Sequence, residues 1–270
     1  MKGKVGEAMS MGERSPSAMI DAAASGRMAV AEALTNLVAS DVRDLKDVKL
    51  SANWMAACGV DGQDAALFDT VQAVSQWCQS LGLSIPVGKD SLSMRTSWEQ
   101  DGESRQVISP VSLVVTAFAQ VADVRRTLTP QLQTNVGDTA LVLIDLGQGK
   151  QRMGASVLAH AFNQVGQSVP DMQDAEAMLA FVKVIRQLAD QDLILAYHDR
   201  SDGGLAATVA EMAFAGHTGV SVNLDMLTID PHAADWGDYK IRAEQVSAVS
   251  YTHLRAHETK ANLVCRLLLE

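Results

Sequence analysis

Hydrophobic residues recur along the chain with two different periods, and these periods predict alternating helices and strands. A recurrence every three or four residues predicts helices over residues 64–81, 154–165, 174–189 and 205–215. An Ala- and Met-rich segment predicts a further helix that Ser15 caps, with Pro16 at its first position, and that runs to about residue 40. Gly26 is expected to break or kink that helix.

Short apolar or alternating runs predict strands over residues 46–53, 84–87, 111–121, 139–146, 193–197 and 220–224. Residues 94–108 predict a hairpin, because Asp101 and Gly102 at its tip suit the positive backbone dihedrals of a tight turn. Strands that alternate with helices in both halves of the chain indicate an α/β fold, with mixed α+β layers.

The best boundary in the chain lies near residue 130, where a Thr- and Pro-containing stretch is followed by polar residues. We therefore expect a first subdomain over residues 1–130 and a second over residues 131–248. Residues 249–270 have no convincing period and resemble an in-frame translation of a transposon-type sequencing adapter, so we leave them out of the fold prediction. His253, His257 and Cys265 then carry no function.

Composition excludes several classes of partner. A formal net charge of −10 gives no electrostatic footprint for nucleic acid or for an anionic membrane surface. No uninterrupted apolar run approaches the ~20 residues that span a bilayer. The three cysteines lack paired metal-ligand spacing, and no secretory signal accompanies them. We expect a cytoplasmic protein that binds neither nucleic acid nor membrane.

The most informative stretch reads His-Asp-Arg-Ser-Asp-Gly-Gly at residues 198–204, between an apolar run and an Ala-rich helix. In such a layout the free amides of a helix N-terminus meet a phosphate or its metal, although the same residues also serve simply as helix caps. Residues 88–91 follow a short apolar strand, and residues 51–54 interrupt another. Three polar turns at strand ends predict a composite nucleotide site.

Individual side chains in these segments have alternative interpretations. Glu32 and Asn36 lie four residues apart, so they are either a solvent-facing polar pair or, joined by Asp199, oxygen ligands of Mg²⁺. Lys89 either neutralises a phosphate or is a surface lysine beside a turn. His198 has no arranged nucleophile beside it, so we interpret it as a positioning residue rather than a catalytic base.

Several stretches together resemble the phosphoribosylformylglycinamidine synthase family in its large single-chain form. The resemblance rests on residues 6–16, 31–36, 49–55, 85–94 and 196–205, in the right order over about residues 6–246. It implies N-terminal and C-terminal subdomains like those of aminoimidazole ribonucleotide synthetase, and this chain looks like most of the second of two pseudo-symmetric synthetase halves. The implied reaction converts formylglycinamide ribonucleotide, ATP and glutamine to the amidine.

The resemblance also implies roles for particular residues. Glu32, Asn36 and Asp199 resemble magnesium ligands, a set that includes a further aspartate upstream of residue 1, and Ser201 resembles a nucleotide contact. Four more residues resemble parts of the nucleotide and substrate loops, namely Ser51, Gly88, Lys89 and Ser91. No residue of this chain is implied to be catalytic. The implied cofactors are Mg²⁺ and ATP or ADP.

Two other interpretations stay open. The chain is a non-catalytic half that retains a structural Mg-nucleotide, or it belongs to another ATP-using enzyme of the same fold, such as aminoimidazole ribonucleotide synthetase. The resemblance to phosphoribosylformylglycinamidine synthase implies that its partners are the remaining synthetase half and the glutaminase domain of one full-length ligase. It also implies ATP and formylglycinamide ribonucleotide as ligands. We then expect this polypeptide alone to be inactive.

Overall fold

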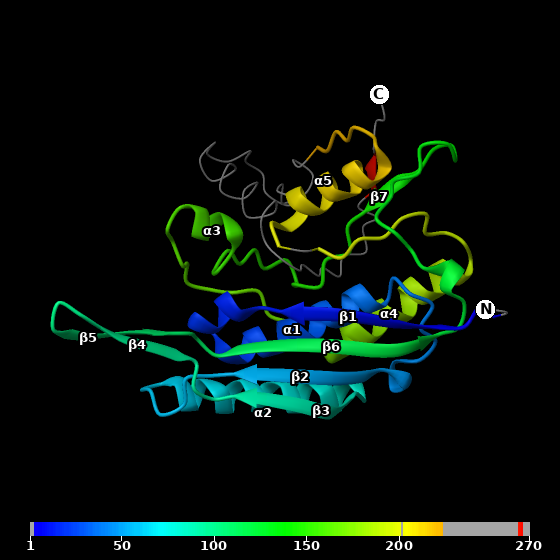
Figure 1. The fold of residues 1–270 in the computed structure, drawn as a ribbon. Helices are drawn as coiled ribbons and strands as arrows, with labels where there is room; N and C mark the ends of the chain where they lie inside the picture. Colours follow the sequence, from blue (N-terminus) through cyan, green and yellow to red (C-terminus); the bar gives the residue numbers. More distant parts are fainter. Residues whose placement is uncertain (1–2, 201, 224–263, 267–270) are drawn as a thin grey trace. The chain divides into compact units, whose positions relative to one another are not determined.

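The computed structural model describes residues 3–200, 202–223 and 264–266, and it divides the chain into two compact units (Figure 1). The first unit comprises Met1–Thr127 and Asp171–Leu193, and the second comprises Leu128–Pro170 and Ile194–Glu270. The units therefore separate after Thr127, but a later segment returns to the first unit.

The first unit is built on a four-stranded sheet in the order β1-β6-β2-β3 (Figure 1). β6 (Ser112–Val121) pairs antiparallel with both β1 (Gly6–Glu13) and β2 (Lys49–Met55), whereas β3 (Ser84–Ser91) pairs parallel with β2. The predicted strands at residues 46–53 and 111–121 are confirmed within a few residues.

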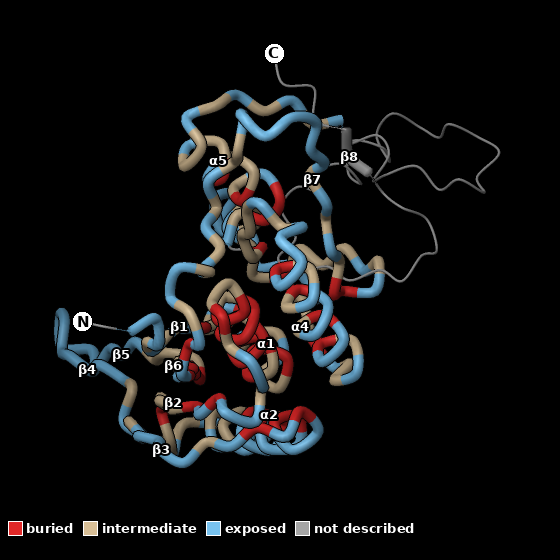
Figure 2. Tube along the Cα trace, turned by 90° about the vertical axis from the view of Figure 1, so that its right-hand side faces the viewer, coloured by how far each residue is buried: buried red, intermediate tan, exposed pale blue. Residues whose placement is uncertain are grey.

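Helices α1 (Ala22–Leu37) and α2 (Gln63–Leu81) lie on one side of this sheet (Figure 2). Burial alternates along β6, where Leu113, Val115 and Ala117 are buried. The opposite face keeps Met9 at 67% and Phe118 at 43% exposure, so the sheet has one covered and one open face.

The start of α1 differs from the prediction. Ser15 is not a cap, because Ser15–Met19 form a separate 3-10 turn, η1, and the Asp21 carboxylate caps α1 by accepting from the Ala24 N–H at 2.8 Å. Gly26 does not break the helix. A Cβ at Gly26 would lie 2.7 Å from methyl groups of Thr70 and Val74, so this glycine lets α1 and α2 approach closely.

The hairpin prediction is confirmed by β4 (Arg95–Gln100) and β5 (Glu103–Ile108), which pair antiparallel around Asp101 and Gly102. Both turn residues have positive φ, at 55° and 79°. Short 3-10 turns, η2 (Leu45–Asp47) and η3 (Val124–Arg126), precede β2 and follow β6.

Helix α4 (Ala175–Asp190) belongs to the first unit and lies on the helical side of the sheet (Figure 2). Its start is held by Arg27, whose guanidinium donates to both carboxylate oxygens of Asp171 at 2.8 Å. Near its end, Arg186 lies 3.2 Å from the carboxylate of Asp41, which is fully buried. Ion pairs thus attach both ends of this segment to the rest of the unit.

The second unit contains α3 (Val157–Ala161), α5 (Gly204–Gly216) and the antiparallel pair β7 (Ala140–Val142) and β8 (Val264–Arg266). The predicted helix at residues 205–215 is confirmed. The predicted strand at residues 139–146 is shorter, at Ala140–Val142, and the predicted helix at residues 154–165 is shorter, at Val157–Ala161. Of the predicted foreign tail, only residues 264–266 are described.

The predicted strand over residues 193–197 is wrong. Asp192 has a φ of 56°, and the Leu193 N–H donates to the Leu188 carbonyl, so this segment begins as the C-terminal cap of α4. Leu193 is also 63% exposed. Residues 220–223 form no strand either, and the last residue of that prediction lies outside the described residues.

In the part of the chain that the structure describes, none of the helices is both apolar enough and long enough to cross a bilayer.

Candidate functional site

The polar segments at residues 51–54 and 88–91 were predicted to be turns. In the structure they lie inside the strands β2 and β3. Parallel pairing places Ala52 opposite Gly88 and Asn53 opposite Lys89. The loop-like composition of residues 88–91 misled the prediction, because pairing with a distant strand extends β3 through them. Pairing nevertheless brings two of the three predicted polar segments side by side.

Ser51, Asn53 and Lys89 share the open face of the sheet, because their neighbours Leu50 and Ala52 are buried under the helices. The Asn53 amide oxygen is buried, and it accepts no hydrogen bond from the described residues. Such an atom calls for a partner outside the protein chain, such as water or a ligand. Sequence reasoning did not single out Asn53, because an isolated asparagine in a strand carries no recognisable signal.

Gly88 and Ser91 lie on the same strand as Lys89, with Gly88 opposite the buried Ala52. A Cβ at Gly88 would lie 3.3 Å from the Ala52 carbonyl oxygen, so glycine suits the close pairing here. The Ser91 carbonyl accepts from the Ala56 N–H at 2.9 Å, which continues the contact between the two strands beyond β2.

Glu32 and Asn36 lie on α1 where it faces the end of β1. The Glu32 carboxylate accepts from the Glu13 N–H at 2.8 Å and from the Arg14 guanidinium at 2.9 Å. The Asn36 side-chain nitrogen donates to the Glu32 carbonyl at 3.1 Å and to the Met11 carbonyl at 3.4 Å. These residues are half-buried and bonded into the fold, and both interpretations of the pair stay predictions.

Arg14 is a member of this cluster that sequence reasoning missed. Its side chain is 8% exposed and forms an ion pair with Glu32. Its partner Glu32 lies 18 residues later in the chain, on a helix, so no local sequence pattern indicates the contact.

Asp199 lies in the loop before α5, with its side chain 8% exposed. His198 Nδ1 is 3.2 Å from an Asp199 carboxylate oxygen, and His198 Nε2 is 3.0 Å from a Glu211 carboxylate oxygen on α5. The hydrogen bond with Asp199 is the main cause of a raised pKa at His198, with the charges of both carboxylates acting in the same direction. Burial, with the Asp199 charge second, raises the pKa of Tyr197 well above its usual range.

The turn into α5 depends on glycine. Gly203 and Gly204 have φ values of 89° and 69°, a region that L side chains rarely adopt. Ser201, the predicted nucleotide contact in this turn, lies outside the described residues.

The predicted metal ligands come from both units, with Glu32 and Asn36 in the first and Asp199 in the second. Within the described residues, no three His, Cys, Asp or Glu side chains gather as a metal site would need. The predicted set has two carboxylates and one amide, so it stays a prediction.

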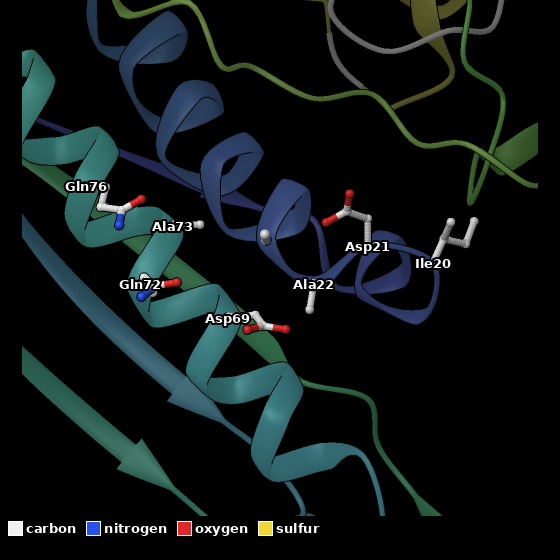
Figure 3. A pocket seen from close by; sticks show the side chains of 8 residues that line it. Ile20, Asp21, Ala22, Asp69, Gln72, Ala73 and Gln76 are labelled. Atoms are coloured by element: carbon white, nitrogen blue, oxygen red, sulfur yellow. The ribbon is translucent and has the colours of Figure 1, made fainter.

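A surface pocket of about 370 Å³ lies elsewhere in the first unit, between the start of α1 and the middle of α2 (Figure 3). Its polar lining residues are Asp21, Asp69, Gln72 and Gln76. None of the predicted nucleotide-site residues lines it.

Two family models match the chain in succession. The FGAR-AT PurM N-like domain matches residues 1–120, and the C-terminal domain of AIR synthase related proteins matches residues 135–254. The chain belongs to the phosphoribosylformylglycinamidine synthase family. The family and the AIR-synthase-like fold predicted from the sequence are thereby confirmed.

Solved structures share this fold. Thermotoga maritima PurL complexed with FGAR is 11% identical, with a TM-score of 0.64 over 93% of this chain and 37% of that chain. The same protein complexed with ATP is 12% identical, with a TM-score of 0.61 over 98% of this chain and 41% of that one. Thiamine-monophosphate kinase from Stenotrophomonas maltophilia is 14% identical, with a TM-score of 0.55 over 94% and 73%. This member of the synthase family thus spans about two fifths of the PurL chains that it matches.

Proposed function

We propose that the chain forms part of the nucleotide site of a phosphoribosylformylglycinamidine synthase, an ATP-dependent ligase of purine biosynthesis. The observation that carries this proposal is the loop before α5, where a buried carboxylate, Asp199, precedes a glycine turn into a helix N-terminus. The Thermotoga PurL structures with FGAR and with ATP lend support, because those proteins share this fold.

In the proposed reaction, the glycinamide carbonyl oxygen of formylglycinamide ribonucleotide takes the γ-phosphoryl group of ATP. Ammonia from glutamine then attacks the carbon of that carbonyl, and phosphate leaves with the oxygen, which gives the amidine. Such chemistry depends on positioning and on neutralising charge more than on a protein nucleophile. Lys89 would offer an ammonium to a phosphate, and Ser51, Ser91 and Ser201 would donate hydroxyl hydrogen bonds. Gly88 would let the ligand approach the backbone.

The donor set fits Mg²⁺, which takes carboxylate and amide oxygens as ligands. Asn36 uses its side-chain nitrogen for both hydrogen bonds described above, so its amide oxygen is the atom that would act as a ligand. Glu32, Asn36 and Asp199 would hold the ion, which when bound neutralises nucleotide phosphates. The Arg14 and Glu13 contacts fix the orientation of Glu32.

Since the chain spans about two fifths of the PurL chains, we propose that alone it binds nucleotide without completing the reaction. The remaining synthetase region and a source of ammonia would then come from other parts of a longer protein. ADP that stays bound through purification, without ATP turnover, would favour a retained structural nucleotide.

The test is calorimetric binding of ATP and of ADP to the purified chain, with and without Mg²⁺. Binding should need Mg²⁺ and weaken at least about tenfold in Asp199→Asn and in Glu32→Gln, because each loses a charged ligand. Asp69→Asn, in the pocket between α1 and α2, is the control with the same change of charge. Absence of binding by a folded chain, or equal binding by all variants, would contradict the proposal.

A further inference from the structure

His198 bridges two carboxylates that belong to different elements of the second unit. Its ring nitrogens lie 3.2 Å from Asp199 in the loop and 3.0 Å from Glu211 on α5. The His198 side chain is 17% exposed, whereas the Glu211 side chain is 51% exposed. The ring therefore connects a buried carboxylate to one on the solvent side of the helix.

The main chain of the loop is tied to the same helix. The Thr208 hydroxyl, on α5, lies 3.5 Å from the Asp199 carbonyl and donates to the Gly204 carbonyl at 3.0 Å. These contacts locate the Asp199 backbone, but they leave the rotation of its carboxylate undetermined. A single hydrogen bond to one carboxylate oxygen removes that freedom, because an aspartate has only two side-chain torsions.

We propose that His198 is a positioning residue that fixes the orientation of the Asp199 carboxylate, with Glu211 holding the opposite edge of its ring. This inference rests on the proposed function, in which Asp199 is a ligand of the nucleotide's metal ion. Because the imidazole ring is rigid, the position of α5 determines the orientation of the Asp199 carboxylate. Outer partners of this kind typically change metal affinity by about 10–100-fold when they are removed.

Two partial replacements separate the halves of the bridge. In His198→Asn, the amide nitrogen stands near the place of Nδ1 and keeps the bond to Asp199. In His198→Gln, the amide nitrogen stands near the place of Nε2 and keeps only the contact with Glu211. His198→Ala removes both, and His160→Ala, on α3, is a matched control in the same unit.

The readout is the Mg²⁺ concentration that half-saturates ADP binding by the full chain, together with the ADP affinity at saturating Mg²⁺. His198→Ala and His198→Gln should raise the half-saturating Mg²⁺ concentration by about 10–100-fold, with ADP affinity at saturating Mg²⁺ within about twofold of wild type. His198→Asn should recover most of the Mg²⁺ affinity that His198→Ala loses. Thermal unfolding of each variant identifies any effect that comes only from a damaged fold.

Two outcomes overturn the inference and are distinguishable. If Asp199→Asn loses Mg²⁺-dependent binding while His198→Ala keeps it, or if His198→Asn is no better than His198→Ala, the positioning role is wrong and the proposed function stands. If Asp199→Asn binds ADP with the same Mg²⁺ dependence as wild type, both fail together.

Discussion

Asp41 is a fully buried carboxylate, and its neutralisation depends on two arginines. Arg43 lies 2.8 Å and Arg186 lies 3.2 Å from the same carboxylate oxygen. Arg186 is 13% exposed and comes from α4, so this contact joins residues that are far apart in the sequence. A buried charge needs such partners, because its removal from water is costly.

Asp41→Ala is therefore expected to lower the free energy of unfolding by about 3–5 kcal/mol, since it leaves the buried Arg186 guanidinium without this carboxylate. Urea denaturation measures the change. The control is Glu103→Ala, which removes an exposed ion pair with Arg105 at 3.8 Å and should cost less than about 1 kcal/mol. Equal effects of the two substitutions would contradict the interpretation of Asp41.

His198 gives the chain a predicted dependence on pH. Because Asp199 and Glu211 raise its pKa, folding favours the protonated ring. This contribution to stability is fully present below the unfolded pKa of ~6.5 and is lost as the pH rises through the higher folded pKa. The difference in unfolding free energy between wild type and His198→Gln should shrink from about pH 6 to pH 8. A difference that grows over that range would show the opposite sign.

At the scale of elements, Gly12 sets how closely β1 meets α1. A Cβ at this position would lie 2.1 Å from the Ala29 carbonyl oxygen and 2.5 Å from the Ala33 nitrogen. Both are backbone atoms of a helix, which cannot move aside as the end of a side chain can. The contact also lies one turn from Glu32 and Asn36, so the spacing of strand and helix locates those side chains.

Gly12→Ala should destabilise the chain by about 3 kcal/mol or more, at the upper end of what overpacking costs. Gly3→Ala is the control, because no heavy atom lies within 4 Å of a Cβ there. Chemical denaturation of the two variants makes the comparison. Similar midpoints for both would mean that the strand and helix separate readily.

The elements that sequence reasoning predicted well are those whose pattern is local. α2, α4, α5 and the β4–β5 hairpin follow from helical periodicity or from turn residues. β3 was predicted too short, because its extension depends on pairing with β2, and residues 193–197 continue a helix cap that the apolar pattern does not reveal.

Prediction of the candidate site has the same limit. The sequence predicted Glu32, Asn36 and Asp199 from family resemblance and suggested His198 as a positioning residue. It did not indicate that Arg14 and Glu13 hold Glu32, or that Glu211 lies beside His198. Those contacts join different elements, so they become visible only when strand register and helix placement are known.

At the scale of the whole molecule, α4 belongs to the first unit although it follows that unit's other residues in sequence by more than 40 positions. A chain that ends at residue 130 lacks Arg186 and Asp171, the partners of Asp41 and Arg27. We expect it to unfold at a lower urea concentration than a chain that ends at residue 194, which retains α4. Coincident transitions would show that α4 is dispensable.

The chain passes between its two units three times, after Thr127, after Pro170 and after Leu193. Neither unit is therefore one continuous stretch of the gene. A single recombination crossover near residue 130 would combine the sheet of one parent with the α4 of another. The two partners of the Arg27–Asp171 ion pair, and those of the Arg186–Asp41 ion pair, would then come from different parents. Exchange of a whole unit between relatives needs crossovers at all three of these positions. The two units are therefore expected to be inherited together.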